Sequence, residues 1–347
     1  MKFTPRIRRY EPFHWGEFIP FLPQKQPDFL KEVFWFAYSR QALKYGLDIL
    51  GIPKKSKILV PDYICNTVEP GIIAAGMEIT YYNITENLTP DFEDAQKKID
   101  KYTKAFLAVN YWGLPAPFKE IREFCKENRL YFIEDNAQGL INRKNSTPLG
   151  RFGDISITSV YKWIPIMHGA VLYVAEPFRK KAKFPNYERF PVKKSLFKYI
   201  FYYVYKYLFN LESPEELKWE NVDCPCPDPY MRVRLNPYVP KLVRFINFDK
   251  LKQNRNRKFR FILRFLKEQD MIKGKIFLNE QELRENIPFQ VPFLIKEDRD
   301  RTEILRFLNS NGIEAFYWPN LPKTVYSNPD AYPVANYFMK NLLHFQV

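Results

Sequence analysis

The sequence predicts an α/β fold in which a large domain, with a mostly parallel sheet flanked by helices, precedes a smaller C-terminal α/β domain. Between residues 57 and 175, short apolar runs alternate with helix-like segments, which is the order of a doubly wound parallel sheet. Beyond residue 176 this alternation stops, and new helix and strand patterns begin near Phe245. A chain of 347 residues with 46% hydrophobic residues can bury the core of such a fold.

Several runs in the first half of the chain have the composition of buried strands. They are KILVP (57–61), MEITYYNI (77–84), AFLAVNYWG (105–113), LYFIEDNA (130–137), DISITSV (154–160) and GAVLYVA (169–175). Between them, residues 65–76, 90–102 and 115–129 have the apolar spacing of helices that pack on a sheet. Because such sheets bind ligands at the carboxyl ends of their strands, residues that end strands are the first site candidates.

The second half of the sequence predicts a connector followed by a small domain. Residues 1–244 would form the large domain and include a helical, proline-rich connector over 193–244. Residues 245–347 would form the small domain. Its predicted helices cover residues 247–269 and 300–312, and its predicted strands cover 289–295 and 313–318.

Composition narrows the class of protein. The 54 Lys and Arg residues against 39 Asp and Glu residues give a net charge of +15, which favours phosphorylated metabolites, nucleic acid or anionic lipid as partners. Nucleic acid is disfavoured because we find no helix-turn-helix, zinc-finger or RNP signature. The four cysteines lack the number of a disulfide framework and the spacing of a zinc site, so we predict reduced thiols and no metal. The N-terminus has no apolar signal region, and we expect a cytoplasmic protein.

Two charged residues lie at the ends of predicted strands. Asp135 ends one strand and Lys162 follows another. Each has an ordinary interpretation, since Asp135 could cap a turn and Lys162 could be a solvated loop residue. Together with Thr158 and Ser159, which could bind a phosphate, they describe a pocket for pyridoxal phosphate: the carboxylate would keep the pyridine nitrogen protonated, and the lysine would form a Schiff base.

The order of the motifs matches a known family. The matching pieces are YSRQAL (38–43), ILVPDYICNTV (58–68), AGMEITYYNI (75–84), VNYWGLPAPFKEI (109–121), YFIEDNAQG (131–139), LGRFGDISITSVYKW (149–163) and GAVLYV (169–174), with weaker similarity at RVRLN (232–236) and GIEAFYWPNLP (312–322). In these pieces the chain resembles the DegT/DnrJ/EryC1/StrS family of fold-type I pyridoxal-phosphate proteins, best known as sugar-nucleotide aminotransferases.

The resemblance implies a set of cofactor ligands. Lys162 would bind the cofactor covalently, Asp135 would pair with the pyridine nitrogen, and Gln138 would lie near the phenolic oxygen. The phosphate would be bound by Ser159 and, at a helix start, by Ser39 and the backbone amides of Arg40 and Gln41. Tyr63 is our choice for the residue that covers the face of the ring, with Cys65 as the alternative.

The substrate side departs from the family pattern. Relatives commonly have two more residues between the phosphate-binding serine and the lysine, and a glycine pair where this chain has HGA. His168 is either a polar substrate contact or an ordinary loop histidine. Asn110 stands where many relatives have histidine, and it is a further candidate for substrate contact. Family members complete each pocket with residues of the neighbouring chain, so we expect a homodimer in which Arg232 and Arg234 reach the partner's site.

By resemblance, the chain is an aminotransferase that moves an amino group from glutamate to a keto-sugar nucleotide in surface-polysaccharide or lipopolysaccharide synthesis. Lys162 favours transamination over dehydration, because the family's dehydratases replace this lysine with histidine. The alternative is a non-catalytic or regulatory protein on the same fold, and a basic nucleic-acid-binding protein is a more distant third.

Residues 196–211 predict an amphipathic helix with an unusual second face. That face carries lysines, among them Lys198 and Lys206, and tyrosines, but no acidic residue. The helix would either dock on the large domain or the partner subunit, or lie peripherally in the headgroup layer of an anionic membrane.

Overall fold

The computed structural model describes residues 23–24, 26–164, 166, 168–180, 228–272, 274, 276, 278, 282–296, 298–311, 313 and 315–346. The predicted helix over residues 196–211, with its proposed membrane face, lies outside the described residues, as do Cys224 and Cys226. Within the described part of the chain, no helix is both long and apolar enough to cross a membrane.

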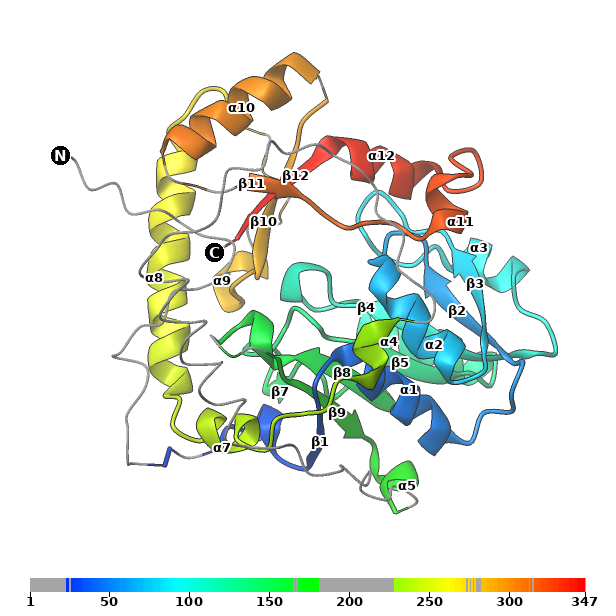
Figure 1. The fold of residues 1–347 in the computed structure, drawn as a ribbon. Coiled ribbons are helices and arrows are strands. Elements are labelled where there is room, and N and C mark those ends of the chain that lie inside the picture. The colour runs from blue at the N-terminus through cyan, green and yellow to red at the C-terminus, as the bar shows by residue number, and fades with distance from the viewer. Residues whose placement is uncertain are drawn as a thin grey trace.

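A seven-stranded sheet forms the centre of the molecule (Figure 1). Its strands, in spatial order, are β1 (Val33–Phe36), β9 (Ala170–Val174), β8 (Ile155–Ser159), β5 (Tyr131–Asp135), β4 (Thr103–Val109), β2 (Lys57–Pro61) and β3 (Glu78–Tyr82). Strand β9 pairs antiparallel with both of its neighbours, whereas the pairs from β8 to β3 are all parallel. The predicted α/β class with a mostly parallel sheet is therefore confirmed. Strand β1 was not predicted from the sequence.

Helices connect these strands and cover the sheet. They are α1 (Ser39–Leu50), α2 (Glu69–Ala74), α3 (Phe92–Lys97), α4 (Phe118–Glu127) and α5 (Glu176–Arg179), and a small hairpin adds β6 (Arg143–Lys144) and β7 (Thr147–Pro148). Helix α1 approaches the sheet closely at Gly46, where a Cβ would lie 2.6 Å from Cδ1 of Ile155 on β8. This contact fixes the position of α1 relative to β8, and the first residues of α1 take part in the site described below.

The C-terminal part forms a second, antiparallel sheet with the order β10-β12-β11. Its elements are α7 (Val239–Val243), α8 (Phe248–Lys267), α9 (Glu282–Glu285), β10 (Gln290–Leu294), α10 (Asp298–Ser310), β11 (Ala315–Tyr317), α11 (Lys323–Tyr326), α12 (Pro333–Asn341) and β12 (Leu342–Gln346). The predicted helices at 247–269 and 300–312 and the strands at 289–295 and 313–318 are present as α8, α10, β10 and β11. Strand β12 and the helices α11 and α12 were missed.

The buried apolar residues do not divide at residue 244. Leu321, Val325 and Phe338, near the C-terminus, belong to the same cluster as the core of β2, β3 and β4. Conversely, Trp163 of the large sheet region packs with the core of α8 and β10. Figure 1 shows α11 and α12 lying over the end of the molecule that holds α2, β2 and β3. The two parts therefore share their cores, and the boundary between residues 244 and 245 remains a prediction.

Asp62, directly after β2, is a buried carboxyl group outside the candidate site. Its side chain has no exposed surface (0%), and its Oδ1 accepts hydrogen bonds from the amides of Tyr63 (2.8 Å) and Ile84 (3.0 Å). Burial raises the pKa of this carboxyl to about 7, although the two amides and Lys98 favour its ionised form. The folded protein therefore holds a proton here at a pH where an unfolded chain does not.

Replacing Asp62 with asparagine should remove a pH dependence of stability. The pKa of Asp62 is about 7 in the folded protein and about 3.9 in an unfolded chain, so the stabilising proton is fully bound below the lower value and lost as the pH rises through the upper one. We expect the free energy of unfolding of the wild type, relative to Asp62→Asn, to fall by at most roughly 4 kcal/mol between about pH 4 and pH 7. Urea denaturation over this pH range measures the difference.

Asp100→Asn is the matched control. Its hydrogen bond with Lys57 lowers the pKa of Asp100 to about 2, so its effect on stability appears only as the pH falls below about 4. A constant difference between wild type and Asp62→Asn from pH 4 to pH 7 would show that Asp62 is ionised in the folded protein.

Candidate active site

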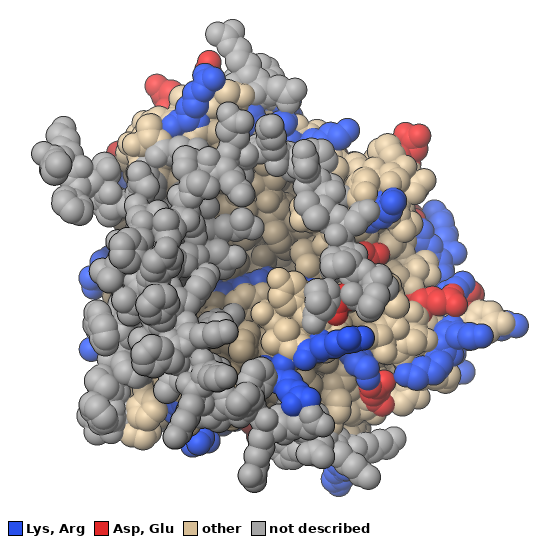
Figure 2. Space-filling view, viewed as in Figure 1, with Lys and Arg blue, Asp and Glu red and all other residues tan. Residues whose placement is uncertain are grey.

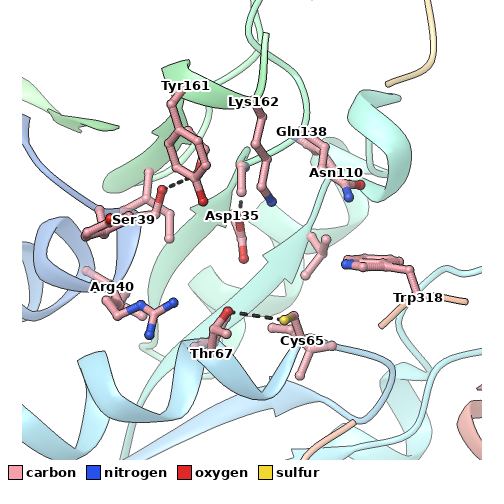
Figure 3. Close-up of a pocket in the computed structure, with 18 residues that line it drawn as sticks. Ser39, Arg40, Cys65, Thr67, Asn110, Asp135, Gln138, Tyr161, Lys162 and Trp318 are labelled. Atoms are coloured by element: carbon pink, nitrogen blue, oxygen red, sulfur yellow. Dashed lines mark hydrogen bonds between the residues drawn. The ribbon is translucent and has the colours of Figure 1, made fainter. Parts of the chain in front are cut away.

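A pocket lies at the carboxyl ends of β4, β5 and β8, beside the first turn of α1 (Figure 3). Its lining includes seven residues selected from the sequence: Ser39, Arg40, Asn110, Asp135, Gln138, Ser159 and Lys162. Cys65, the alternative candidate for the ring face, also lines it. Tyr63, Thr158, His168, Arg232 and Arg234 lie outside this lining.

Lys162 and Asp135 meet in this pocket because β5 and β8 are parallel neighbours. Asp135 ends β5, and Lys162 ends the 3-10 turn η4 (Val160–Lys162) that follows β8. Figure 3 shows the ammonium end of Lys162 directed toward Asp135. The sequence predicts that each residue lies at or directly after the end of a strand, and the parallel pairing of these strands brings both to one edge of the sheet.

Burial acts on both groups. Desolvation lowers the pKa of Lys162, while Cys65 and Asp135 oppose that change and Arg40 adds to it. Desolvation raises the pKa of Asp135, which is only 5% exposed, while the amide of Ala137 and the ammonium of Lys162 lower it. Both groups are therefore less charged than on a protein surface, and Lys162 has more of its amine in the neutral, nucleophilic form.

Glu134, next to Asp135, has a structural role that the sequence did not reveal. Its buried carboxylate accepts five hydrogen bonds: from Nδ2 of Asn110 (2.8 Å), the amides of Gly150 (2.7 Å), Phe152 (2.8 Å) and Gly153 (3.2 Å), and Oγ of Ser156 (2.8 Å). Because successive residues of a strand point to opposite faces, Glu134 holds the loop before β8 while Asp135 faces the pocket.

Two hydroxyl groups lie at the start of α1. Oγ of Ser39 and Oγ of Ser159 are 2.6 Å apart, and both residues line the pocket. The N-terminus of a helix attracts anions, so this corner suits a phosphate group. Thr158 has the opposite orientation, because its Oγ1 accepts a hydrogen bond from Nδ2 of Asn136 (3.1 Å) on the other face of β8.

The next two residues of α1 are engaged with the segment that follows residue 228. The amide of Gln41, expected to bind the phosphate, donates to the carbonyl of Tyr38 (3.1 Å). Its side-chain Nε2 donates to the carbonyls of Tyr230, Met231 and Val233. Arg40 forms an ion pair with buried Asp228. The side chain of Gln41 therefore binds the backbone of residues 230–233 to the start of α1. The role of its backbone amide as a phosphate ligand stays a prediction.

The choice of Tyr63 to cover the ring face does not fit the structure. Tyr63 is fully buried (0% exposed), and its hydroxyl donates to the carbonyl of Trp318 (2.8 Å). Cys65 and Trp318 line the pocket instead. Sequence reasoning missed Trp318 as a site residue, because only the packing of the C-terminal part against the large sheet brings it there.

Gln138 presents an unused donor. Its Oε1 accepts from the amide of Trp112 (2.9 Å), and its carbonyl accepts from the indole nitrogen of Trp163 (3.2 Å). Its Nε2 is buried and has no hydrogen-bond partner among the described residues. A buried donor of this kind stabilises a bound group that presents an acceptor atom to it.

The expected substrate residues are more dispersed. Nε2 of partly buried His168 accepts from the amide of Asn236 (3.0 Å), and burial lowers the pKa of the imidazole. Asn110 lines the pocket, but its Oδ1 accepts from the amide of Ala116 (3.2 Å) and its Nδ2 donates to Glu134. Arg232 and Arg234 are exposed.

The polar groups of the pocket fit the chemistry of pyridoxal phosphate. An amine with a lowered pKa, a buried carboxylate, an unused amide donor and two hydroxyls at a helix start lie on different walls of one cavity. Among the described residues there is no group of His, Cys, Asp and Glu that could hold a metal ion.

Comparison with known proteins confirms the family resemblance. Residues 32–170 match the model of the DegT/DnrJ/EryC1/StrS aminotransferase family. GDP-perosamine synthase of Vibrio cholerae is 32% identical over 121 residues, which cover 35% of this chain and 33% of that protein. The match thus spans about a third of the curated relative.

Solved structures of the same fold match over most of the chain. A DegT/DnrJ/EryC1/StrS aminotransferase from Brucella abortus has a TM-score of 0.60 at 18% identity, covering 91% of this chain and 80% of that one. The GDP-4-keto-6-deoxy-D-mannose-3-dehydratase of E. coli, solved with bound hydrated PLP, has a TM-score of 0.57 at 21% identity, covering 90% of this chain and 82% of that one.

The adjacent carboxylates of Glu134 and Asp135 should differ in how much they contribute to the stability of the folded protein. Glu134→Gln places an amide where a carboxylate accepts five hydrogen bonds, so we expect a loss of about 3 kcal/mol or more in the free energy of unfolding. Asp135→Asn keeps an oxygen for the Ala137 amide and removes a charge that burial disfavours, so we expect a change below about 1 kcal/mol. Denaturation without added cofactor measures both, and a larger loss for Asp135→Asn would contradict this division.

Proposed function

We propose, from the match of residues 32–170 to the DegT/DnrJ/EryC1/StrS aminotransferase family, that this chain is a pyridoxal-phosphate-dependent aminotransferase. The observation that carries the proposal is the joint placement of Lys162 and Asp135 in one buried pocket. When bound, pyridoxal phosphate supplies an electron sink for chemistry at the carbon that carries the amino group.

Lys162 has the properties that transamination requires. Its lowered pKa leaves a larger fraction of neutral amine to bind the cofactor's aldehyde, and the same Nζ can afterwards accept and return a proton. Asp135 faces the same space and would hold the pyridine nitrogen protonated. The carboxylate would then be paired with a cation in the bound state, which offsets the cost of its burial.

The remaining walls would orient the cofactor. Ser39, at the start of α1, and Ser159, at the end of β8, would bind its phosphate. Nε2 of Gln138 would donate a hydrogen bond to the phenolic oxygen of the cofactor. Cys65 and Trp318 would contact the ring, because both line the pocket.

We infer a keto-sugar nucleotide as the amino acceptor and glutamate as the donor. The name of the Vibrio cholerae relative, GDP-perosamine synthase, concerns a nucleotide-linked amino sugar. A net charge of +15 favours a diphosphate substrate, and Figure 2 shows many basic and fewer acidic side chains on the described part of the face in view. Such a product would serve surface-glycan synthesis in the cytoplasm.

The exposed Arg232 and Arg234 support a homodimer with shared sites. They belong to the segment that Gln41 and Arg40 bind at the start of α1, yet neither lines the pocket of its own chain, so we assign them to the pocket of the partner subunit. A diphosphate group that spans two subunits would be neutralised by such arginines.

Dehydration is the second candidate activity, because the dehydratase of E. coli shares this fold. A lysine at position 162 disfavours it, since the resemblance gives dehydratases a histidine there. A non-catalytic scaffold is disfavoured as well, because a protein without a ligand gains nothing from burying an amine beside a carboxylate.

Borohydride reduction should fix pyridoxal phosphate on Lys162. We expect the wild type to yield one labelled peptide, the one that contains Lys162, and Lys162→Ala to yield none. Lys126→Ala, which changes an exposed lysine of α4, is the control and should label like the wild type. Mass spectrometry of the digest identifies the site, and a cofactor on another lysine would refute the assignment.

Subunit mixing tests the shared site. Lys162→Ala and Arg234→Ala homodimers should each lack activity. When the two variants are mixed, unfolded and refolded together, up to about a quarter of the wild-type activity should return, because half of the chains form mixed dimers and each mixed dimer has one intact site. A monomeric wild type with full activity in sedimentation and kinetic measurements would exclude the arrangement.

A further inference from the structure

Asn142 is a buried amide that lies behind the wall of the pocket rather than in it. Its side chain is 1% exposed. Nδ2 donates to the carbonyls of Gly113 and Ile287, both at 2.7 Å, and Oδ1 accepts from the amide of Ile287 (3.1 Å). Asn142 thus joins the 3-10 turn η3 (Tyr111–Gly113) after β4 to the residues that precede β10.

The turn that Asn142 binds is unfavourable for the residues it contains. Trp112 has φ 54° and ψ 18°, in the left-handed region, and Gly113 has φ 77°. A left-handed conformation costs a residue other than glycine roughly 1–2 kcal/mol. At Gly113 a Cβ would lie 2.1 Å from the carbonyl oxygen of Gln138, so the turn also presses against the residue that lines the pocket. Such a turn persists only where neighbouring groups hold it.

The same turn sets the orientation of the Gln138 amide. The backbone N–H of Trp112 donates to Oε1 of Gln138 at 2.9 Å. An amide group can rotate by half a turn and exchange its oxygen and nitrogen, and this hydrogen bond selects one of the two orientations. The selected orientation leaves Nε2 as the unused donor of the pocket wall.

We propose that Asn142 is a positioning residue of the active site: by holding the left-handed Trp112–Gly113 turn, it keeps the Trp112 amide on Gln138 and so directs the Gln138 donor toward the bound cofactor. The proposal rests on the proposed function, because it assigns Gln138 Nε2 to an oxygen of pyridoxal phosphate. Asn142 touches neither the cofactor nor the substrate.

The connection also links the site to the C-terminal part of the chain. Besides Asn142 and Ile287, the amide of Phe289 donates to the carbonyl of Trp112 (2.6 Å). Phe289 therefore binds the turn that orients Gln138 directly, and Ile287 is joined to it through Asn142. This second bond should retain part of the turn when Asn142 is replaced, so we expect a changed site rather than an unfolded protein.

The test compares Asn142→Ala with Asn336→Ala in full-length protein loaded with pyridoxal phosphate. Asn336 is a matched control, since it is buried and its Nδ2 also donates to two carbonyls, those of Val325 and Tyr332. The measurement is the pH titration of the absorption band of the bound cofactor, together with its dissociation constant. Neither requires turnover.

We expect Asn142→Ala to raise the apparent pKa of this absorption change by about one unit, because a donor to an anionic oxygen stabilises the unprotonated form of the bound group. The dissociation constant should rise about tenfold. Asn336→Ala should lower the melting temperature, but its apparent pKa and its dissociation constant for the cofactor should equal those of the wild type. In a Gln138→Met background, Asn142→Ala should no longer shift the pKa, which shows that it acts through Gln138.

If Asn142→Ala does not fold, Asn142→Ser, which keeps one hydroxyl donor, takes its place in the test. The apparent pKa and the dissociation constant should again rise. Equal titrations for wild type and the Asn142 variant, or an unchanged shift in the Gln138→Met background, would overturn the proposal. A wild type that binds no pyridoxal phosphate would instead overturn the proposed function, and this inference with it.

Discussion

The desolvation of an amine and a carboxylate that follow adjacent strands to one edge of the sheet is the constraint on which the site depends. Parallel pairing of β5 and β8 brings Asp135 and Lys162 to one edge of the sheet, and desolvation then acts on both, lowering the pKa of the lysine and raising that of the aspartate. Neither change favours the protein without a ligand, since each group loses hydration. A ligand that offers an electrophilic carbon to one and a cationic nitrogen to the other relieves both costs.

Around this pair, several buried polar side chains are satisfied by one another. Glu134 binds Asn110 and the loop before β8, and Asn136 connects Asn110 to Thr158. Such a connected buried network resists rearrangement, because breaking any bond leaves a buried group without a partner. The strand ends that carry Asp135 and Ser159 are therefore held in place before a ligand arrives, which is the condition for orienting a cofactor without reorganisation.

The sequence predicts those features that depend on local pattern and strand order. The strands from KILVP to GAVLYVA and the meeting of Asp135 with Lys162 follow from alternation and from the carboxyl-end rule. Prediction from the sequence failed where a residue's place depends on the direction of its side chain or on packing between segments that are distant in the chain. Thr158 and Ser159 are equivalent by composition, and only strand register assigns Ser159 to the pocket. Cys65 rather than Tyr63 faces the cavity, and Trp318 reaches it from the C-terminal part. Asn142 has no local signal, because its partners are Gly113 and Ile287.

A half-reaction tests transamination by this chain most directly. Protein loaded with pyridoxal phosphate is mixed with glutamate in the absence of any amino acceptor, and the 2-oxoglutarate formed is measured against the amount of protein. Transamination that requires Lys162 predicts one equivalent of 2-oxoglutarate per chain, none from Lys162→Ala, and loss of the cofactor's absorption band at the rate at which the product appears. A wild type that holds the cofactor on Lys162 yet releases no oxoacid from glutamate or another amino donor would contradict transamination and leave the chain as a binding protein on this fold.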